Sequence, residues 1–241
     1  MYVAYAATQQ VWKLNDWKVL AKIMVPPLII IGLIVKENLS TAIICGVITI
    51  AILFVASPKY WHFFVIGIVA VVGGIAMIFL VSYRSDRIDA WRNVETHPKG
   101  YQTLQSLYAI GSGGLWGKGL GQSIQKMDFI PEVQNDMIFS VICEELGLVG
   151  GIALILLFIF LIWRLMVVIT NARDLYGSLL VVGVMAHVSV QVLINIAVVT
   201  NTIPNTGIPL PFISYGGTSL VFLLIEMGIV LSVARQIKMR K

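Results

Sequence analysis

The strongest candidate for chemistry is the carboxylate of Asp136, which stands where polar sequence turns apolar. The stretch from Ile130 to Gly151 reads IPEVQNDMIFSVICEELGLVGG, and Asp136 directly precedes the apolar part. An ionisable side chain at a boundary between membrane and water is costly unless it is hydrogen-bonded, paired or facing a wet cavity. Asp136 is therefore a catalytic candidate. The alternative is that Asp136 and Glu132 only stabilise the N-terminus of the following helix.

Helical spacing predicts which residues share the surroundings of this acid. At about 100° per residue, one helix face would carry Asp136, Ser140, Cys143, Gly147 and Gly150. Glu144 falls about 80° from that face, and Glu145 falls on the opposite side. We therefore expect these two neighbouring acids to have different surroundings.

A glycine-rich segment upstream of Asp136 could hold an anion. Glycines stand at positions 111, 113, 114, 117, 119 and 121, with Lys118 among them and Lys126 just after. Such a segment can turn tightly and present backbone N–H groups to a phosphate. Alternatively, the glycines only form turns. No strand precedes them, so the pattern is neither a Walker A nor a dinucleotide-binding fingerprint.

Polar residues also occur in two later stretches. His187, Gln191 and Asn195 share one helix face, where they would either bond neighbouring helices or contact a substrate. Glu226, in the last apolar segment, could pair with that face or with a helix not included in this sequence, or it could stay buried as a structural acid. Ser214 ends the proline-rich stretch NTIPNTGIPLPFISYGG, which cannot form a regular helix and should shape a cavity wall.

Composition identifies the elements that must position these residues. With 58% hydrophobic residues, 12% charged residues and a mean hydropathy of +0.90, the chain lies far outside the soluble range. We predict an all-α polytopic membrane protein, a single domain over residues 1–241. Its six transmembrane helices would lie at about 19–35, 40–56, 62–81, 137–163, 175–200 and 214–235. Residues 82–134 would form one long loop, of a length that is usually functional.

Charge distribution predicts the orientation in the membrane. Cationic residues concentrate on one side of the predicted spans, at positions 13, 18, 22, 59, 164, 173, 235, 238, 240 and 241. That side should be cytoplasmic and contain both termini, and the loop 82–134 should be extracytoplasmic. The net charge of +5 indicates affinity for anionic membrane lipid, while no basic and aromatic pattern of nucleic-acid recognition is present. Cys45 and Cys143 fall inside apolar segments and imply neither a disulfide nor a metal site.

Two motifs, KMDFIPEVQNDMIFSVICEELG and PNTGIPLPFISYGGTSL, resemble the SEDS family (shape, elongation, division and sporulation) of FtsW, RodA and SpoVE. The resemblance extends across nearly the whole chain, and the GLGQSIQK segment is more similar to the FtsW and SpoVE branch. The six helices would be the last six of the family's ten. The chain would then be a fragment, begin at an internal methionine, or be a shortened member.

The resemblance implies an enzyme of the cell membrane that polymerises lipid II into peptidoglycan during cell division, elongation or sporulation. It also implies a class B penicillin-binding protein as partner. The family's essential aspartate aligns with Asp136 through the pattern P-E-x-x-x-D, and four more residues match motif positions: Lys126, Glu132, Glu144 and Glu145. Two positions depart from the family's pattern: residues 36–41 lack its proline, and Asn135 replaces its usual threonine.

For this chemistry, Asp136 would act as general base or as a metal-assisted positioning group for a sugar hydroxyl. The departing undecaprenyl diphosphate needs positive charge, which Arg87, Lys118 and Lys126 or a divalent ion (Mg or Mn) held by Asp136 could supply. Further side chains would contact the substrate: Glu132, Glu144, Glu145, His187, Gln191 and Ser214. The rival functions are a lipid II flippase that uses intramembrane acids and His187, and a non-catalytic membrane scaffold.

Overall fold

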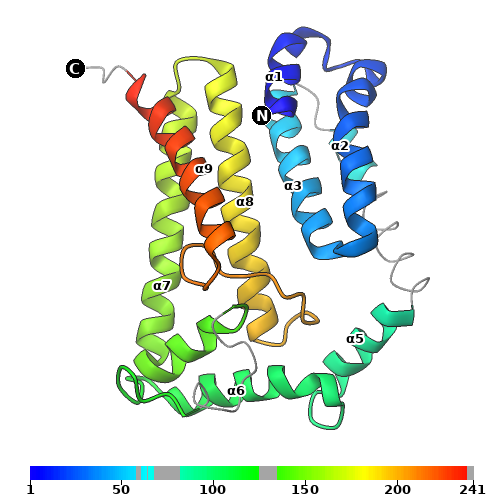
Figure 1. Cartoon of the computed structure of the whole chain (residues 1–241). Coiled ribbons are helices and arrows are strands. Elements are labelled where there is room, and N and C mark those ends of the chain that lie inside the picture. The colour runs from blue at the N-terminus through cyan, green and yellow to red at the C-terminus, as the bar shows by residue number, and fades with distance from the viewer. Residues whose placement is uncertain (58–60, 64, 68–81, 125–134, 238–241) are drawn as a thin grey trace. The chain divides into compact units, whose positions relative to one another are not determined.

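The computed structural model describes residues 1–57, 61–63, 65–67, 82–124 and 135–237 (Figure 1). In these residues every regular element is helical, as predicted. The elements before residue 60 are α1 (Tyr2–Gln9), the short 3-10 helix η1 (Val11–Lys13), α2 (Trp17–Glu37) and α3 (Leu39–Ala56). They are followed by α5 (Ser82–Arg92), η2 (Pro98–Gly100), α6 (Tyr101–Gly113), α7 (Ile138–Asn171), α8 (Leu175–Val199) and α9 (Gly217–Arg235).

Five of these helices, α2, α3, α7, α8 and α9, are long and apolar enough to cross a membrane. They confirm an all-α polytopic membrane protein, and each of them overlaps one of the six predicted spans. The remaining predicted span, at 62–81, lies mostly outside the described residues. The helices form because each crossing must satisfy its backbone hydrogen bonds internally where no water is available.

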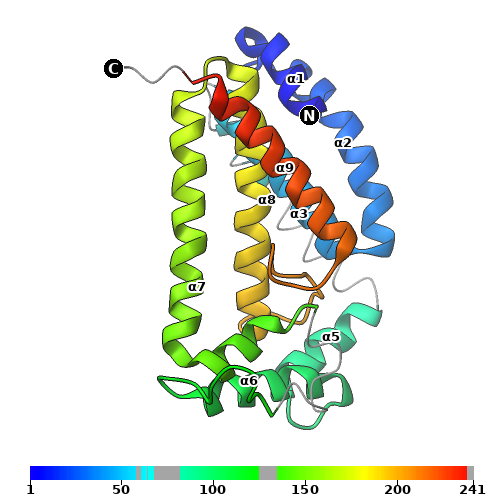
Figure 2. The same ribbon diagram turned by 60° about the vertical axis from the view of Figure 1, so that its left-hand side comes forward.

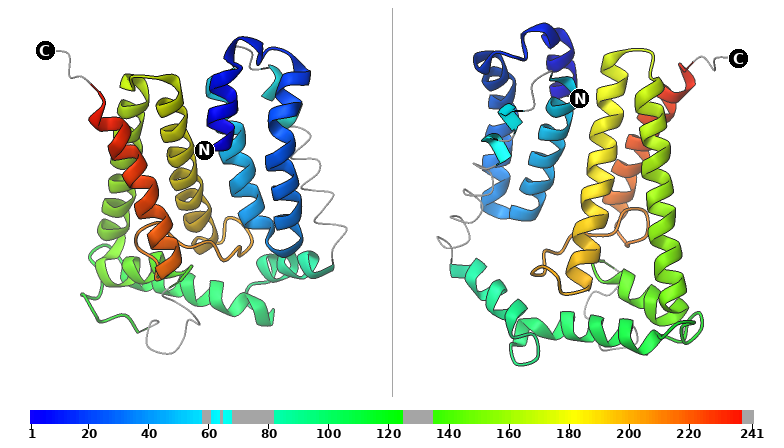
Figure 3. Two further views of the ribbon diagram at one scale, coloured as in Figure 1. Left: turned by 45° about the horizontal axis from the view of Figure 1, so that its top comes forward. Right: turned by 180° about the vertical axis from the view of Figure 1, so that it is seen from behind.

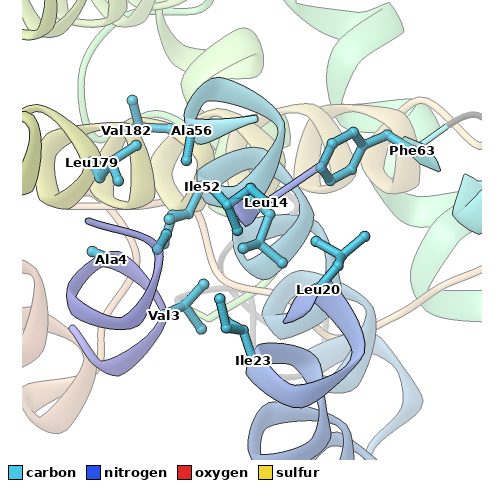
Figure 4. Packing of buried hydrophobic residues seen from close by; sticks show 12 residues of the cluster. Val3, Ala4, Leu14, Leu20, Ile23, Ile52, Ala56, Phe63, Leu179 and Val182 are labelled. Atoms are coloured by element: carbon cyan, nitrogen blue, oxygen red, sulfur yellow. The ribbon is translucent and has the colours of Figure 1, made fainter. Parts of the chain in front are cut away.

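The chain divides into two compact units, and the first comprises residues 1–71, 160–190 and 221–241. Here α2 and α3 form an antiparallel pair (Figure 3). Side chains from α1, α2, α3 and α8 make one buried apolar cluster, shown in Figure 4, that includes Val3, Leu20, Ile23, Ile52, Leu53, Leu179 and Val182. The short α1 is therefore held by packing rather than by its own length.

Side-chain caps set where the first two spans begin. The Asp16 carboxylate accepts a hydrogen bond from the backbone N–H of Lys18 at 3.0 Å, at the start of α2. Asn38 Oδ1 accepts one from the N–H of Thr41 at 3.1 Å, at the start of α3. Each cap satisfies a backbone donor that the first turn of a helix leaves without an internal partner.

The second unit comprises residues 72–159 and 191–220. The region predicted as a long loop is partly helical here, because α5, η2 and α6 lie within it. The sequence TLQSLYAIG lies within α6. Figure 2 shows α6 lying crosswise to the membrane-crossing part of α7. A helix in this orientation can place side chains at the end of a span without crossing the membrane itself.

Helix α7 is interrupted at Gly147, where φ is 70° and ψ is −169°. The predicted face through Asp136, Ser140, Cys143, Gly147 and Gly150 therefore does not continue as one straight helix, and that expectation is corrected. The first segment, residues 138–146, packs against α6. The membrane-crossing segment begins at residue 148. Helical periodicity continues on both sides of the glycine, so the sequence pattern conceals the break.

Replacing Gly147 with alanine should destabilise the protein. A Cβ at this position would meet the backbone carbonyl oxygen of Leu115 and the backbone nitrogen of Gly117, neither of which can rotate away. Together with the positive φ, this should cost about 1–3 kcal/mol of unfolding free energy, measured by thermal unfolding in detergent. Gly228→Ala is the matched control, because a Cβ there meets open space in α9. An equal effect of the two substitutions would contradict the strained contact.

Candidate functional site

The carboxylate of Asp136 lies just before α7 and is 8% exposed. Its Oδ1 accepts a hydrogen bond from Gln102 Nε2 of α6 at 3.2 Å. Asn195 of α8 holds the backbone at the same position, because its Nδ2 donates to the carbonyl oxygen of Asp136 at 2.7 Å and to that of Ile208 at 2.9 Å. Residues of α6 and α8 thus hold both the side chain and the main chain of Asp136. These contacts come in addition to any interaction of the carboxylate with the N-terminus of α7.

Asp136 borders a cavity of about 440 Å³, within the usual size range of small-molecule sites. The cavity is lined from α5, η2, α6 and the connection after α8. Its lining residues are Arg87, Ala90, Trp91, Pro98, Lys99, Tyr101, Gln102, Thr103, Asp136, Asn201, Asn205 and Gly207. Two cations, aromatic rings and amides therefore surround the one carboxylate of the lining.

A chain of hydrogen bonds holds the walls of this cavity together. Asn205 Nδ2 donates to Gln102 Oε1 at 3.2 Å, and Arg87 Nη1 donates to the backbone oxygen of Asn205 at 3.3 Å. Trp91 Nε1 donates to the backbone oxygen of Asn201 at 2.9 Å. Helices α5 and α6 are thereby joined to the irregular connection that follows α8. This connection forms a cavity wall, as its three prolines predict.

Glu144 lies apart from the cavity lining, in a buried ionic cluster at the other end of α6. Its side chain is fully buried and accepts from Lys118 Nζ at 2.6 Å. Further donors to this carboxylate are the Ser123 hydroxyl, the Ser112 hydroxyl at 3.4 Å and the backbone N–H of Ile124 at 3.3 Å. A buried carboxylate with this many donors is well compensated for the loss of water. The geometry supports a structural function for Glu144 and Lys118.

The glycine loop, which we define as residues 114–124, packs on the break in α7. The backbone N–H of Lys118 donates to the carbonyl oxygen of Glu144 at 2.9 Å, and that of Gly119 donates to Glu145 at 3.0 Å. The glycines therefore allow the backbone of the loop to approach the backbone of α7 closely. This supports the turn interpretation of the segment over the phosphate-binding one. The side chain of Glu145 is partly exposed, so the two neighbouring acids differ in their surroundings, as predicted.

The remaining sequence candidates lie in other places. His187 Nδ1 pairs with the Glu226 carboxylate at 2.9 Å, so among the alternatives left open for that acid the structure shows pairing with the polar face of α8. The hydroxyl of Ser214 accepts from the N–H of Leu210 at 2.7 Å and closes a local turn. Gln191 is buried, with its Oε1 lacking a partner in the described part of the chain. Lys126 and Glu132 lie outside the described residues.

Sequence reasoning missed Lys99, Gln102 and Asn205 as site residues. Gln102 lies near the start of the short helix α6, and its position as a polar residue on a helix beside the membrane is the signal that could have found it. Asn205 lies within the proline-rich stretch, for which the sequence predicts an irregular cavity wall but no individual site residue. Neither pattern indicates a contact with Asp136, because the bonding partners are far apart along the chain.

Comparisons with known proteins show what this chain is similar to. The sequence model of the FtsW, RodA and SpoVE family, described as "Cell cycle protein", matches residues 1–239. Stage V sporulation protein E of Bacillus subtilis is 44% identical over 202 residues, covering 83% of this chain and 55% of the relative. The "Probable peptidoglycan glycosyltransferase FtsW" of Coxiella burnetii is 37% identical over 219 residues, covering 86% and 59%. The chain thus spans little more than half the length of these relatives.

Solved structures share the fold. A structure described as "Structural coordination of polymerization and crosslinking by a peptidoglycan synthase complex" matches with a TM-score of 0.69 at 25% identity, covering 89% of this chain and 61% of that one. RodA of Thermus thermophilus matches with a TM-score of 0.64 at 26% identity, covering 98% and 62%. Together with the motifs around Asp136 and Ser214, these matches establish that the chain belongs to the FtsW, RodA and SpoVE family of cell cycle proteins.

Proposed function

We propose that the chain carries the catalytic aspartate of a membrane peptidoglycan glycosyltransferase that polymerises lipid II. The observation that carries this proposal is the buried carboxylate of Asp136 in a cavity that also contains Arg87 and Lys99. A base for a sugar hydroxyl and positive charge for a diphosphate are the two requirements of the reaction. Relatives named probable peptidoglycan glycosyltransferases support the same reaction class.

In the proposed step, the 4-hydroxyl oxygen of one sugar attacks the anomeric carbon of a second, lipid-linked sugar. The bond from that carbon to the diphosphate oxygen breaks, and its electron pair leaves with undecaprenyl diphosphate. Asp136 takes the hydroxyl proton, and Gln102 keeps the carboxylate oriented through its hydrogen bond. Arg87 and Lys99 offset the charge that develops on the diphosphate, and Lys126 remains a further candidate for this function.

A divalent ion is compatible with this site as a supplementary group. Among the described residues, no three His, Cys, Asp or Glu side chains come close enough together to hold a metal on their own. Mg²⁺, however, is commonly bound through one or two carboxylates together with phosphate oxygens and water. Asp136 would be the protein ligand, and the ion would supply positive charge to the diphosphate.

The orientation and the partner also belong to the proposal. The first unit contains the N-terminal segment, the turn between α7 and α8, and the C-terminal end of α9, with Lys13, Lys18, Arg173 and Arg235. This concentration of cations supports cytoplasmic termini, and the region 82–134 would then be extracytoplasmic. A class B penicillin-binding protein is the partner that the family resemblance implies, and the similarity to a structure of a peptidoglycan synthase complex supports a partner of this kind.

The test is polymerisation of labelled lipid II in proteoliposomes with a class B penicillin-binding protein. This chain should be compared with a version extended at its N-terminus by the four further helices that the resemblance implies, because part of the substrate cavity would come from them. Glycan strands from the extended version support the proposal. Absence of strands from both versions, with both proteins folded, would overturn it.

The rival flippase function makes a different prediction about Glu226, which lies midway along α9 and pairs with His187. In a transporter, an acid in the middle of the membrane would be expected to serve the transport route. We expect Glu226→Gln to leave lipid II polymerisation at the wild-type level, because Glu226 is not among the residues that line the Asp136 cavity. Loss of lipid II flipping in vesicles that contain the Glu226→Gln variant would favour the flippase instead.

A further inference from the structure

The glycine loop has an apolar outer surface. Its large apolar side chains are all more than half exposed: Leu115, Trp116, Leu120 and Ile124. Trp116 is 81% exposed and Leu120 is 77% exposed. The one charged residue in the loop, Lys118, directs its ammonium group to the buried Glu144. The loop therefore presents leucine, isoleucine and tryptophan with little charge among them, which is typical of a binding surface.

Two backbone hydrogen bonds fix the position of this loop along the axis of α7. The N–H of Leu148 donates to the carbonyl oxygen of Gly114 at 2.9 Å, and that of Val149 donates to Leu115 at 3.3 Å. Leu148 and Val149 are the first exposed apolar residues after the break at Gly147. The loop is thus attached where the membrane-crossing segment begins.

The length of that segment indicates what surrounds the loop. Residues 148–171 span roughly 36 Å at about 1.5 Å per residue, slightly more than the hydrocarbon thickness of about 30 Å. Leu148 therefore lies close to one boundary of the hydrocarbon. The apolar surface of the loop continues directly into the exposed apolar side chains of the helix, which include Ile152, Leu156 and Leu157.

We propose that the glycine loop inserts its apolar side chains into the lipid headgroup region, with Trp116 as an interfacial anchor. The ring of tryptophan is amphipathic and is enriched at this level of membrane proteins. A lipid surface is favoured over a protein partner because the loop extends the lipid-facing surface of α7 and offers little charge for recognition. This inference does not depend on the proposed glycosyltransferase activity.

The test measures the depth of single nitroxide labels in vesicles that contain this chain alone. Cys45 and Cys143 are first replaced by alanine, and cysteine is then introduced in separate variants as Trp116→Cys and Leu120→Cys. Two reference sites bracket the expected depth: Glu95→Cys at an exposed polar position and Leu157→Cys on the lipid-facing surface of α7. Power saturation with oxygen and with a water-soluble nickel complex gives the relative access of each reagent.

We expect the labels at positions 116 and 120 to be more accessible to oxygen than to nickel, with a depth between those of the two reference sites. Nickel access equal to that at position 95, for both labels, would overturn the proposal and indicate a water-exposed surface that another protein covers. The labelled positions are already highly exposed, so substitution there should not prevent folding. The measurement is repeated at a high lipid-to-protein ratio, where contacts between copies are diluted.

Discussion

Asp136→Asn abolishes glycan polymerisation while leaving the fold intact, according to the proposed function. Asparagine has nearly the same shape as aspartate, and its Oδ1 can still accept the hydrogen bond from Gln102. The bonds from Asn195 go to the backbone oxygen at this position and do not depend on the side chain. The amide cannot take a proton from the attacking hydroxyl, so turnover should fall by at least about 100-fold.

The measurement is lipid II polymerisation in proteoliposomes with the penicillin-binding partner, accompanied by thermal unfolding in detergent. Asp89→Asn is the matched control, because Asp89 is an exposed acid on α5 outside the cavity lining. This control should polymerise lipid II like the wild type. Turnover retained by Asp136→Asn would exclude proton transfer to this carboxylate, whereas a lowered unfolding temperature would show that the acid has a structural function.

The membrane-crossing helices could be predicted from the sequence because hydropathy alone determines them. Each needs about 20 apolar residues, and this requirement does not depend on contacts with the rest of the chain. Asp136 could also be found, since a carboxylate next to an apolar helix is unusual whatever surrounds it. In both cases the signal is local and does not depend on residues far away along the chain.

The partners of Asp136 could not be predicted in the same way. Gln102 is 34 positions from Asp136 along the chain, and Asn205 is 103 positions from Gln102. Such contacts result from the packing of α6 against the connection after α8, and no periodicity encodes them. The same limit applies to Lys118, whose charge and glycine-rich surroundings predict a position near a phosphate but which instead pairs with Glu144.

The structure shows that the Glu144 cluster and Asp136 lie at opposite ends of one helix pair. Residues 138–146 pack against α6, where Gln102 contacts Asp136 at one end and Ser112 contacts Glu144 at the other. Because both ends are bonded, the position of Asp136 depends on the position of Glu144. Disruption of the ionic cluster should therefore disturb both stability and catalysis.

Lys118→Met should destabilise the protein by about 3–5 kcal/mol, because it removes the cation beside a carboxylate that is fully buried. Glu144→Gln should cost less, since Lys118 is 28% exposed and can turn toward water. The double variant should lose less unfolding free energy than the two single losses added together, because neither partner is then left charged alone. Thermal unfolding in detergent measures all three variants, with Lys22→Met as an exposed-lysine control. Additive losses would show that Lys118 and Glu144 contribute no coupling energy to stability.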